Sequence, residues 1–286
     1  MSATTSAPAP TVPVRAVGLG RVLRSEWVKL WSLRSTYWTI ALTLLAMLML
    51  ALLMAVAARA VATDESFAPA EVGLDGLTVL GTAYGMAQLV IAVLGVLVVT
   101  GEYSTGMIRS SLTAVPTRLP VLVAKAVLVA VVSFVVGVVG IALAYVLTMP
   151  MLADAGGAAE LSDPDTLRMF WGTGLYLAAV GLFGLAIGTI VRHSAGAIAV
   201  VVGVLLILPT VLQLAMNALD WLRDLYPYLP TTAGDRIITA GGPGEAMSGM
   251  PGLPELLDPW VGYGVFLAYV AVALLVAAVL LRRRDA

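Results

Sequence analysis

The chain has 286 residues, of which 60% are hydrophobic and only 12% carry a charge. A soluble domain has about 25% charged residues, so this composition excludes an ordinary water-soluble fold. The absence of cysteine excludes disulfides and thiolate metal sites, and the lone His193 excludes a metal site built from several histidines of one chain.

The N-terminal 34 residues divide into a tail and a predicted amphipathic helix. Residues 1–18 begin with a run of Ser, Thr, Ala and Pro that is typical of a disordered tail. Residues 19–34 place Leu, Val and Trp opposite Arg, Lys and Ser at helical spacing, which favours a helix lying in the membrane interface. Its candidate interfacial residues are Trp27, Lys29 and Trp31. A simple charged anchor for the following span is the alternative.

Six apolar stretches predict transmembrane helices. About 20 helical residues cross a hydrocarbon core of roughly 30 Å, and backbone groups inside lipid must be bonded within the segment. The predicted fold class is therefore all-α, a polytopic membrane protein with its transmembrane domain over residues 35–281. The spans are expected at about 36–58, 78–100, 126–148, 169–191, 194–218 and 260–281. None of them is expected to contain an ionisable acid or base.

The charged residues are divided unevenly between the two sides of these spans. Twelve of the 16 Lys and Arg residues lie on the side that carries both termini, whereas 14 of the 17 Asp and Glu residues lie on the other side. The positive-inside rule therefore predicts that both termini are cytoplasmic, including a short tail of residues 282–286. The first apolar stretch is too long for a signal peptide, so we expect it to stay in the membrane.

The connection after the second span begins like a phosphate-binding loop. Gly101 and Gly106 flank four residues, but Met107 and Ile108 stand where such a loop needs Lys and Ser or Thr. ATP is therefore not expected to bind there. The segment predicts either a short helix that begins near Glu102, where a helix N-terminus favours a carboxylate, or a solvated linker.

Residues 219–258 form a long connection on the opposite side of the membrane. Their first half is amphiphilic, and their second half is rich in Gly, Pro and Met. A connection of this length beside a bundle is more often packed than free, so we expect an extracellular re-entrant or cap region. Pro209, within the fifth span, is expected to kink that helix and to free a backbone carbonyl.

The predicted spans lack the residues that an enzyme or an ion-coupled transporter needs. Catalysis requires convergent acids, bases or metal ligands, and ion coupling usually buries an ionisable residue in the membrane. Apart from hydroxyl groups, the polar candidates are Gln88, Gln213 and Asn217, which either bond neighbouring helices or line a pathway. We expect no active site, no metal site and no nucleic-acid partner. Energy for transport would come from a partner that hydrolyses ATP.

Several features in this order resemble the permease subunits of ABC-2 type transporters. They are the amphipathic helix with "RSEWVKLWSLRSTYW", the segment "GEYSTGMIRSSLTAVPTRLPVLVAK" at 101–125, the span that follows it directly, and "YPYLPTTAGDRI" at 226–237, which is similar to a Leu-Pro-x-x-Ala-Gly segment of the family. The first of these is similar to versions common in actinobacteria.

The resemblance implies a type V exporter-like fold and half of a transporter in the cell membrane. A second permease subunit, identical or related, would pair with this chain, and each would dock on a separate ABC ATPase subunit that holds ATP and magnesium. The pathway would lie between the two permeases and carry a hydrophobic, lipid-like, peptide or drug-like substrate. The chain would also have membrane lipid as a partner. The family's coupling helix maps onto Glu102, Tyr103, Thr105, Gly106, Met107, Ile108 and Arg109.

Two other functions remain open on the sequence. A membrane scaffold or an immunity-type binding protein would sequester a peptide or recruit a partner without transport. A secondary transporter would move its substrate with an ion gradient. The direction of transport is also open, because no residue of the chain specifies export over import.

Overall fold

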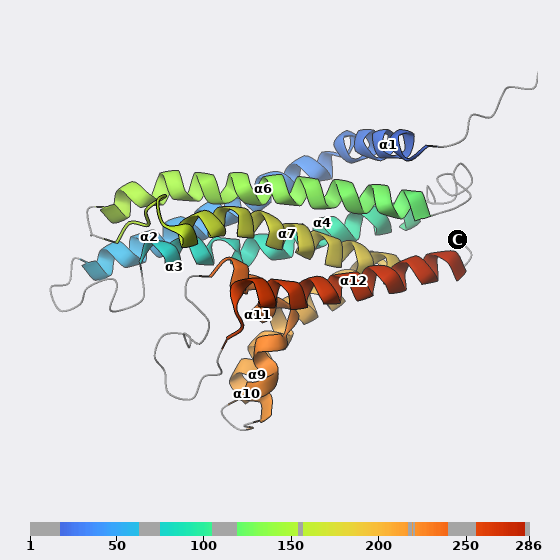
Figure 1. Ribbon diagram of the computed structural model, residues 1–286. Helices are drawn as coiled ribbons and strands as arrows, with labels where there is room; N and C mark the ends of the chain where they lie inside the picture. Colours follow the sequence, from blue (N-terminus) through green and yellow to red (C-terminus); the bar gives the residue numbers. More distant parts are fainter. Residues whose placement is uncertain are drawn as a thin grey trace, which may run out of the picture.

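The computed structural model describes residues 18–62, 75–104, 119–153, 157–216, 219, 221–239 and 256–283. Every secondary-structure element within these residues is helical. Six helical segments are long and apolar enough to cross a membrane, and most of them lie side by side along one axis (Figure 1). Within the described residues, the all-α class and six helices that are long and apolar enough to cross a membrane are therefore confirmed.

The first helices of the chain are separated by a single extended residue. Helix α1 (Leu19–Ser32) ends before Leu33, whose φ of −88° and ψ of 121° break the helix, and α2 (Arg34–Ala62) starts immediately afterwards. The hydroxyl of Thr36 donates to the carbonyl of Leu30 across this elbow at 2.7 Å. The predicted boundary at residue 34 is therefore wrong by two residues, because the helix stops at the elbow.

The second span consists of two helices. Helix α3 (Gly76–Thr82) is capped by Asp75, whose carboxylate accepts from the backbone N–H of Thr78 at 2.9 Å, and α4 (Tyr84–Ser104) follows after one residue. An Asp at the N-cap satisfies one of the free N–H groups of a first helical turn. The helical stretch therefore extends beyond the predicted 78–100 at both ends.

The third and fourth spans are also longer than their apolar stretches. Helix α6 (Leu119–Ala153) has 35 residues, about 52 Å at 1.5 Å per residue, and α7 (Pro164–Val191) has 28. Helix α7 begins with Asp163 at the N-cap and a proline in its first turn, both favourable helix starts. The last span, α12, covers Pro259–Arg283. Charged residues at the helix ends therefore belong to the helices.

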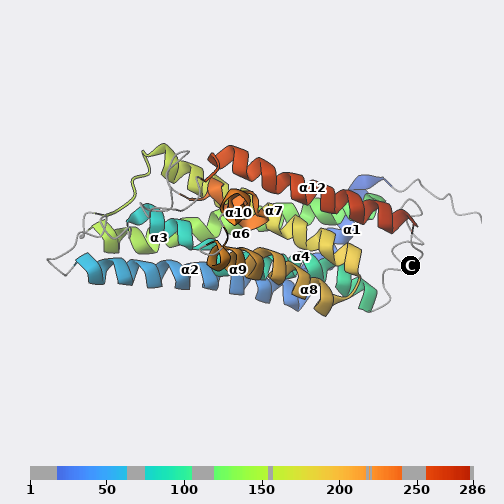
Figure 2. The same ribbon diagram turned by 90° about the horizontal axis from the view of Figure 1, so that it is seen from below.

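Helix α7 lies at the centre of the bundle and contacts α4, α6, α8 and α12 (Figure 2). In its apolar window 67% of the residues are buried, compared with 22% in α2 and in α12. Glycines permit this packing: a side chain at Gly184 would collide with the Ala92 carbonyl, and one at Gly188 would lie 3.0 Å from the Val96 carbonyl. The outer helices are left with large apolar surfaces exposed.

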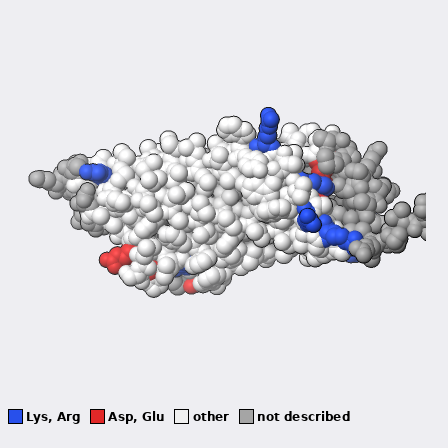
Figure 3. All heavy atoms as spheres, turned by 90° about the horizontal axis from the view of Figure 1, so that it is seen from above, with Lys and Arg blue, Asp and Glu red and all other residues white. Residues whose placement is uncertain are grey.

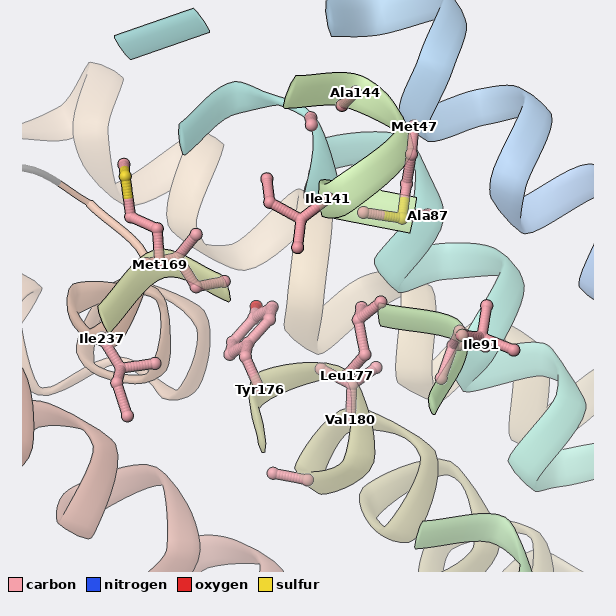
Figure 4. Close-up of a cluster of buried hydrophobic side chains, with 14 of the residues drawn as sticks. Met47, Ala87, Ile91, Ile141, Ala144, Met169, Tyr176, Leu177, Val180 and Ile237 are labelled. Atoms are coloured by element: carbon pink, nitrogen blue, oxygen red, sulfur yellow. The ribbon is translucent and has the colours of Figure 1, made fainter. Parts of the chain in front are cut away.

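The main hydrophobic core joins α2, α4, α6 and α7 with a short segment near residue 237. Figure 4 shows Met47, Ile91, Ile141, Tyr176 and Ile237 converging from these elements. All five side chains are fully buried. A protein interior of this kind is closely packed, so the short segment that contributes Ile237 is part of the bundle and not a loose connection.

The fifth span is bent and leaves the bundle. It runs through α8 (Ser194–Val202), a π-helical turn (Gly203–Ile207) and α9 (Leu208–Ala215). Helix α8 contacts α4 and α7, whereas α9 buries none of its own residues and projects away from the other spans (Figures 1 and 2). Pro209 lacks the N–H that would bond Leu205, so the predicted kink lies where the sequence placed it.

The region after α9 turns back toward the bundle through short helices. These are α10 (Trp221–Leu225), the 3-10 turn Tyr226–Tyr228, α11 (Pro230–Gly234) and the 3-10 turn Asp235–Ile237. All five residues of α11 are buried. The close packing of Gly234 explains the small residue there, because an added side chain would lie 2.6 Å from the ring of Phe266. Residues 240–255 of the expected cap lie outside the described residues.

The two ends of the bundle differ in charge. We call the end that carries α1 and the last residues of α12 the α1 end, and the opposite end the far end. On the face drawn in Figure 3, most Lys and Arg side chains gather toward the α1 end, and most Asp and Glu side chains toward the far end. The fold therefore keeps apart the charges that the sequence separates.

Candidate functional site

Four charged side chains from three helices form a buried ion network at the α1 end. We call Glu26 and Lys29 of α1, Glu102 of α4 and Lys125 of α6 the α1-end network. The Lys125 ammonium lies 2.7 Å from Glu26 Oε2 and 2.8 Å from Glu102 Oε1, and the Lys29 ammonium lies 2.6 Å from Glu26 Oε1 and 3.1 Å from Glu102 Oε1. Each cation therefore bridges both carboxylates, and the network joins helices that are far apart in sequence.

The electrostatics of the network keep its α1 members charged. Burial acts to raise the pKa of Glu26, but the charge and hydrogen bond of Lys125, with Lys29, outweigh it and lower that pKa below its usual value. Burial acts to lower the pKa of Lys29, yet its bonds to the two carboxylates raise it. Both groups are therefore ionised around neutral pH.

Local helical geometry places these groups together. Val22, Glu26 and Leu30 are the buried residues of α1, four residues apart, so they share the side that packs against α6. Glu102 lies in the last turn of α4, where the helix dipole disfavours a carboxylate, and the two lysines offset this effect. The expectation that Glu102 begins a short helix is wrong, because α4 extends through Ser104.

The predicted spans contain no ionisable residues, but the helices that contain these spans extend beyond them to charged residues. Glu102 and Lys125 lie inside helices that qualify as membrane spans, and both are buried. The apolar stretch of the third span begins at residue 126, but α6 already starts at Leu119. A buried pair is tolerated there because each charge is bonded to an opposite one.

Tyr103 attaches the same turn of α4 to a fourth helix. The guanidinium carbon of Arg192, which caps the end of α7, lies 5.3 Å from the centre of the Tyr103 ring. Arg192 has a left-handed φ of 60° and donates its backbone N–H to the Gly188 carbonyl, which closes the helix. The last turn of α4 is therefore tied to α1 and α6 through Glu102 and to the end of α7 through Tyr103.

The other predicted coupling residues, Thr105, Gly106, Met107, Ile108 and Arg109, lie outside the described residues. The segment they belong to starts directly after the turn that holds Glu102 and Tyr103.

The predicted interfacial residues of α1 form an aromatic group on its exposed side. Trp27 is 44% exposed, and its ring centre lies 5.4 Å from that of Trp31, which in turn lies 5.4 Å from that of Tyr37 in α2. Lys29 points the other way, into the network. Lys29 and the two tryptophans therefore lie on different sides of α1, as the helical spacing of the sequence predicts.

The three polar residues predicted in the spans differ in their surroundings. Gln88 is buried, and its side-chain oxygen accepts from the Tyr176 hydroxyl at 2.6 Å, which joins α4 to α7 as expected for a helix-bonding residue. Gln213 is exposed on α9. Asn217 lies outside the described residues.

A second polar cluster lies at the residues that turn back to the bundle after α9. We call residues 221–237 the returning segment. Its members, which we call the Asp235 cluster, are Tyr84, Gln88, Tyr176 and Asp235. The Tyr84 hydroxyl donates to Asp235 Oδ2 at 2.8 Å, and its ring meets that of Tyr176 edge-on at 5.2 Å. Burial raises the pKa of Asp235 to about 7, more than the Tyr84 hydrogen bond and the charge of Arg236 lower it.

The returning segment also donates a hydrogen bond to a backbone carbonyl of the kinked fifth span. The Thr231 hydroxyl donates to the Leu205 carbonyl at 2.9 Å, in a buried position. In an α-helix this carbonyl would accept from the N–H of residue 209, which Pro209 lacks. The freed group expected from the sequence is therefore bonded to the predicted re-entrant region.

Sequence reasoning missed Glu26, Lys125 and Asp235. Glu26 is the one acid within the basic segment of residues 15–34, and Lys125 directly borders an apolar stretch. Both features can be seen in the sequence, but neither indicates that Glu26 and Lys125 contact each other. Among the described residues, no group of three or more His, Asp or Glu could hold a metal ion.

No protein-family model matches the chain, and no curated protein matches its sequence.

Proposed function

We propose that this chain is the membrane permease subunit of an ATP-driven ABC-2 type transporter. The α1 end would face the cytoplasm of a multi-pass cell-membrane protein, because the basic residues gather there. The chain would use ATP bound by a separate ABC ATPase subunit, and its cargo would be a hydrophobic, lipid-like, peptide or drug-like substrate.

The observation that carries this proposal is the attachment of the last turn of α4. Glu102 binds Lys29 of α1 and Lys125 of α6, and Tyr103 contacts Arg192 at the end of α7. The proposed ATPase contact, over about residues 102–112, includes this turn. A displacement of that segment would therefore pull on four helices together, which is what coupling to a partner's ATP cycle requires.

The exposed apolar surface of α9 supports a second permease subunit. Val211 and Leu214 are 54% and 73% exposed, and α9 projects from the bundle. In lipid, a projecting helix of this kind gains packing from a neighbouring helix. The pathway would then run between two such subunits.

The experiment that tests this function begins with a search for a P-loop ATPase encoded beside the gene and combines the chain with that ATPase. We expect the two to co-purify in detergent and the reconstituted permease to change the rate of ATP hydrolysis. Gly106→Pro should abolish that change without reducing the amount of membrane protein, because proline removes helical hydrogen bonding in the proposed contact. Gly264→Ala, in α12 with open space around it, is the matched control.

A scaffold would behave differently in the same experiment. Its cellular phenotype would persist when the phosphate-loop lysine of the partner ATPase is replaced, whereas an ATP-driven permease would lose it. Failure of any ATPase to bind the solubilised chain would overturn the proposal.

A further inference from the structure

A pocket of about 440 Å³ opens beside the α1-end network. It lies between α1, the start of α2, the end of α4 and α6. Its apolar walls come from Leu30, Leu33, Leu97, Val98, Leu128 and Val129. Ligand pockets usually measure about 300–1,000 Å³ and combine apolar walls with a few polar groups, so this one is large enough for part of an amphiphile.

The polar groups of the pocket are concentrated at the network. Lys29, Ser32 and Ser35 line the pocket together with the two carboxylates and Lys125. The side chain of Lys29 is 33% exposed, whereas those of Lys125, Glu26 and Glu102 are 5%, 5% and 9% exposed. The Lys29 ammonium, which is bonded to both carboxylates, is therefore the most accessible charge of the network, with hydroxyl groups beside it.

The α1 end as a whole is basic, whereas the four charges that line the pocket itself sum to zero. Among the described residues of the α1 end, eight basic side chains stand against the two acids Glu26 and Glu102. The basic ones are Arg21, Arg24, Lys29, Arg34, Lys125, Arg192, Arg282 and Arg283. Arg34 stands between two lining residues, Leu33 and Ser35. Basic residues at a membrane surface attract anionic headgroups by about 1 kcal/mol each.

The apolar part of the pocket is partly exposed on the outer surface of the bundle. Leu33 is 52% exposed and Leu97 is 37% exposed, in a chain whose spans are apolar on their outer sides. Trp27, Trp31 and Tyr37 lie at the same elbow between α1 and α2, and aromatic residues of this kind gather at headgroup depth. A ligand could therefore reach the network from the adjoining leaflet.

We infer that this pocket binds one anionic phospholipid from the leaflet on the α1 side. Its phosphate lies at the Lys29 ammonium and the hydroxyls of Ser32 and Ser35, and an acyl chain lies along Leu97, Val98 and Leu128. The lipid thus joins the elbow between α1 and α2 to the end of α4. This inference does not depend on an ATPase partner, because it uses contacts within one chain.

Native mass spectrometry of the purified full-length chain tests the lipid site. The chain in a neutral detergent is titrated with palmitoyl-oleoyl phosphatidylglycerol and, separately, with the matching phosphatidylcholine. We expect one phosphatidylglycerol molecule to be retained at concentrations where phosphatidylcholine is lost. Inorganic phosphate in excess should not displace it, because phosphate has no acyl chain.

Two variants with matched controls locate the site. Lys29→Gln should weaken phosphatidylglycerol binding about five-fold, the equivalent of one lysine–headgroup contact. Arg24→Gln removes an equal charge from the exposed side of the same helix and should weaken binding less. Leu97→Trp should reduce retention by filling the apolar wall, while Val135→Trp, at an exposed position of α6 away from the pocket, should leave it unchanged.

Three outcomes would overturn the inference. They are equal retention of the two lipids, equal weakening by Lys29→Gln and Arg24→Gln, and unchanged retention in Leu97→Trp. If Lys29→Gln does not fold, Leu97→Trp still decides, because it leaves every charge of the network in place.

Discussion

Both polar clusters of this protein bury ionisable side chains, but the two clusters stabilise these side chains in different ways. The α1-end network buries two cations and two anions that neutralise each other, whereas the Asp235 cluster holds one carboxylate through a tyrosine hydroxyl. Burial of an ion is costly unless it is paired, so the first cluster stays charged and the second has a carboxyl pKa raised to about 7. Ionic pairing therefore fixes the α1 end, whereas packing and hydrogen bonds fix the returning segment.

The largest expected effect comes from breaking the network at its centre. Lys125→Met leaves Glu26 and Glu102 with Lys29, and removal of one partner from a buried ion pair costs about 3–5 kcal/mol. Unfolding of the purified protein by denaturing detergent should show this loss. Arg24→Gln, an exposed charge of the same sign, should stay within about 0.5 kcal/mol of the unchanged protein. Equal effects of the two variants would show that the network does not hold the helices together.

The packing of the returning segment should be sensitive to an increase in side-chain volume and not to a change in charge. Gly234→Ala places a methyl group 2.6 Å from Phe266 and 2.9 Å from Tyr176 and should destabilise the protein by about 1–3 kcal/mol. Gly264→Ala in α12, where the space is open, should be neutral or slightly stabilising, since alanine favours a helix. The same unfolding assay compares the two. A neutral Gly234→Ala would mean that the segment is not packed as the structure places it.

The bond between the returning segment and the kinked span is expected to contribute less. Thr231→Val keeps the shape of the side chain but leaves the Leu205 carbonyl without its donor, which should cost about 1–2 kcal/mol. Thr210→Val is the control, because the exposed Thr210 hydroxyl bonds a carbonyl of its own helix. Hydrogen exchange at residues 203–211 should rise in Thr231→Val alone. Equal exchange in both variants would contradict the proposed link.

Stability should also depend on pH through the Asp235 cluster. The pKa of Asp235 is raised in the folded protein to about 7, so the folded state binds more protons than the unfolded state between about pH 4 and pH 7. Stability from this group is therefore present at low pH and is lost as the pH rises through 7. Unfolding measured from pH 5 to pH 8 should show a downward slope that Asp235→Asn removes.

Asp224→Asn serves as the control for that slope, because Asp224 is exposed on α10. The network should contribute little over the same range, since the pKa of Glu26 is lowered and that of Lys29 is raised, both away from neutrality. A slope that survives Asp235→Asn would assign the pH dependence to another group.

Much of the architecture could be predicted from local patterns. Apolar runs of sufficient length gave the six spans, the alternation of residues 19–34 gave α1, and Pro209 gave the kink. Helix ends could not be predicted from hydropathy, because charged residues such as Glu102 and Lys125 continue a helix as readily as they end it once their charges are paired. For the same reason, the sequence indicated only part of the candidate site, including Glu102 and Tyr103.

By itself, the sequence determined the helical class, the spans and the separation of charge between the two ends, because these follow from residue types counted over short windows. Only the tertiary structure decided which charges meet. Glu26 and Lys125 are 99 positions apart and are joined because α1 packs on α6. Likewise, Thr231 reaches the carbonyl freed at Leu205 only because the chain folds back into the bundle. Contacts between distant segments depend on packing, and no local pattern encodes them.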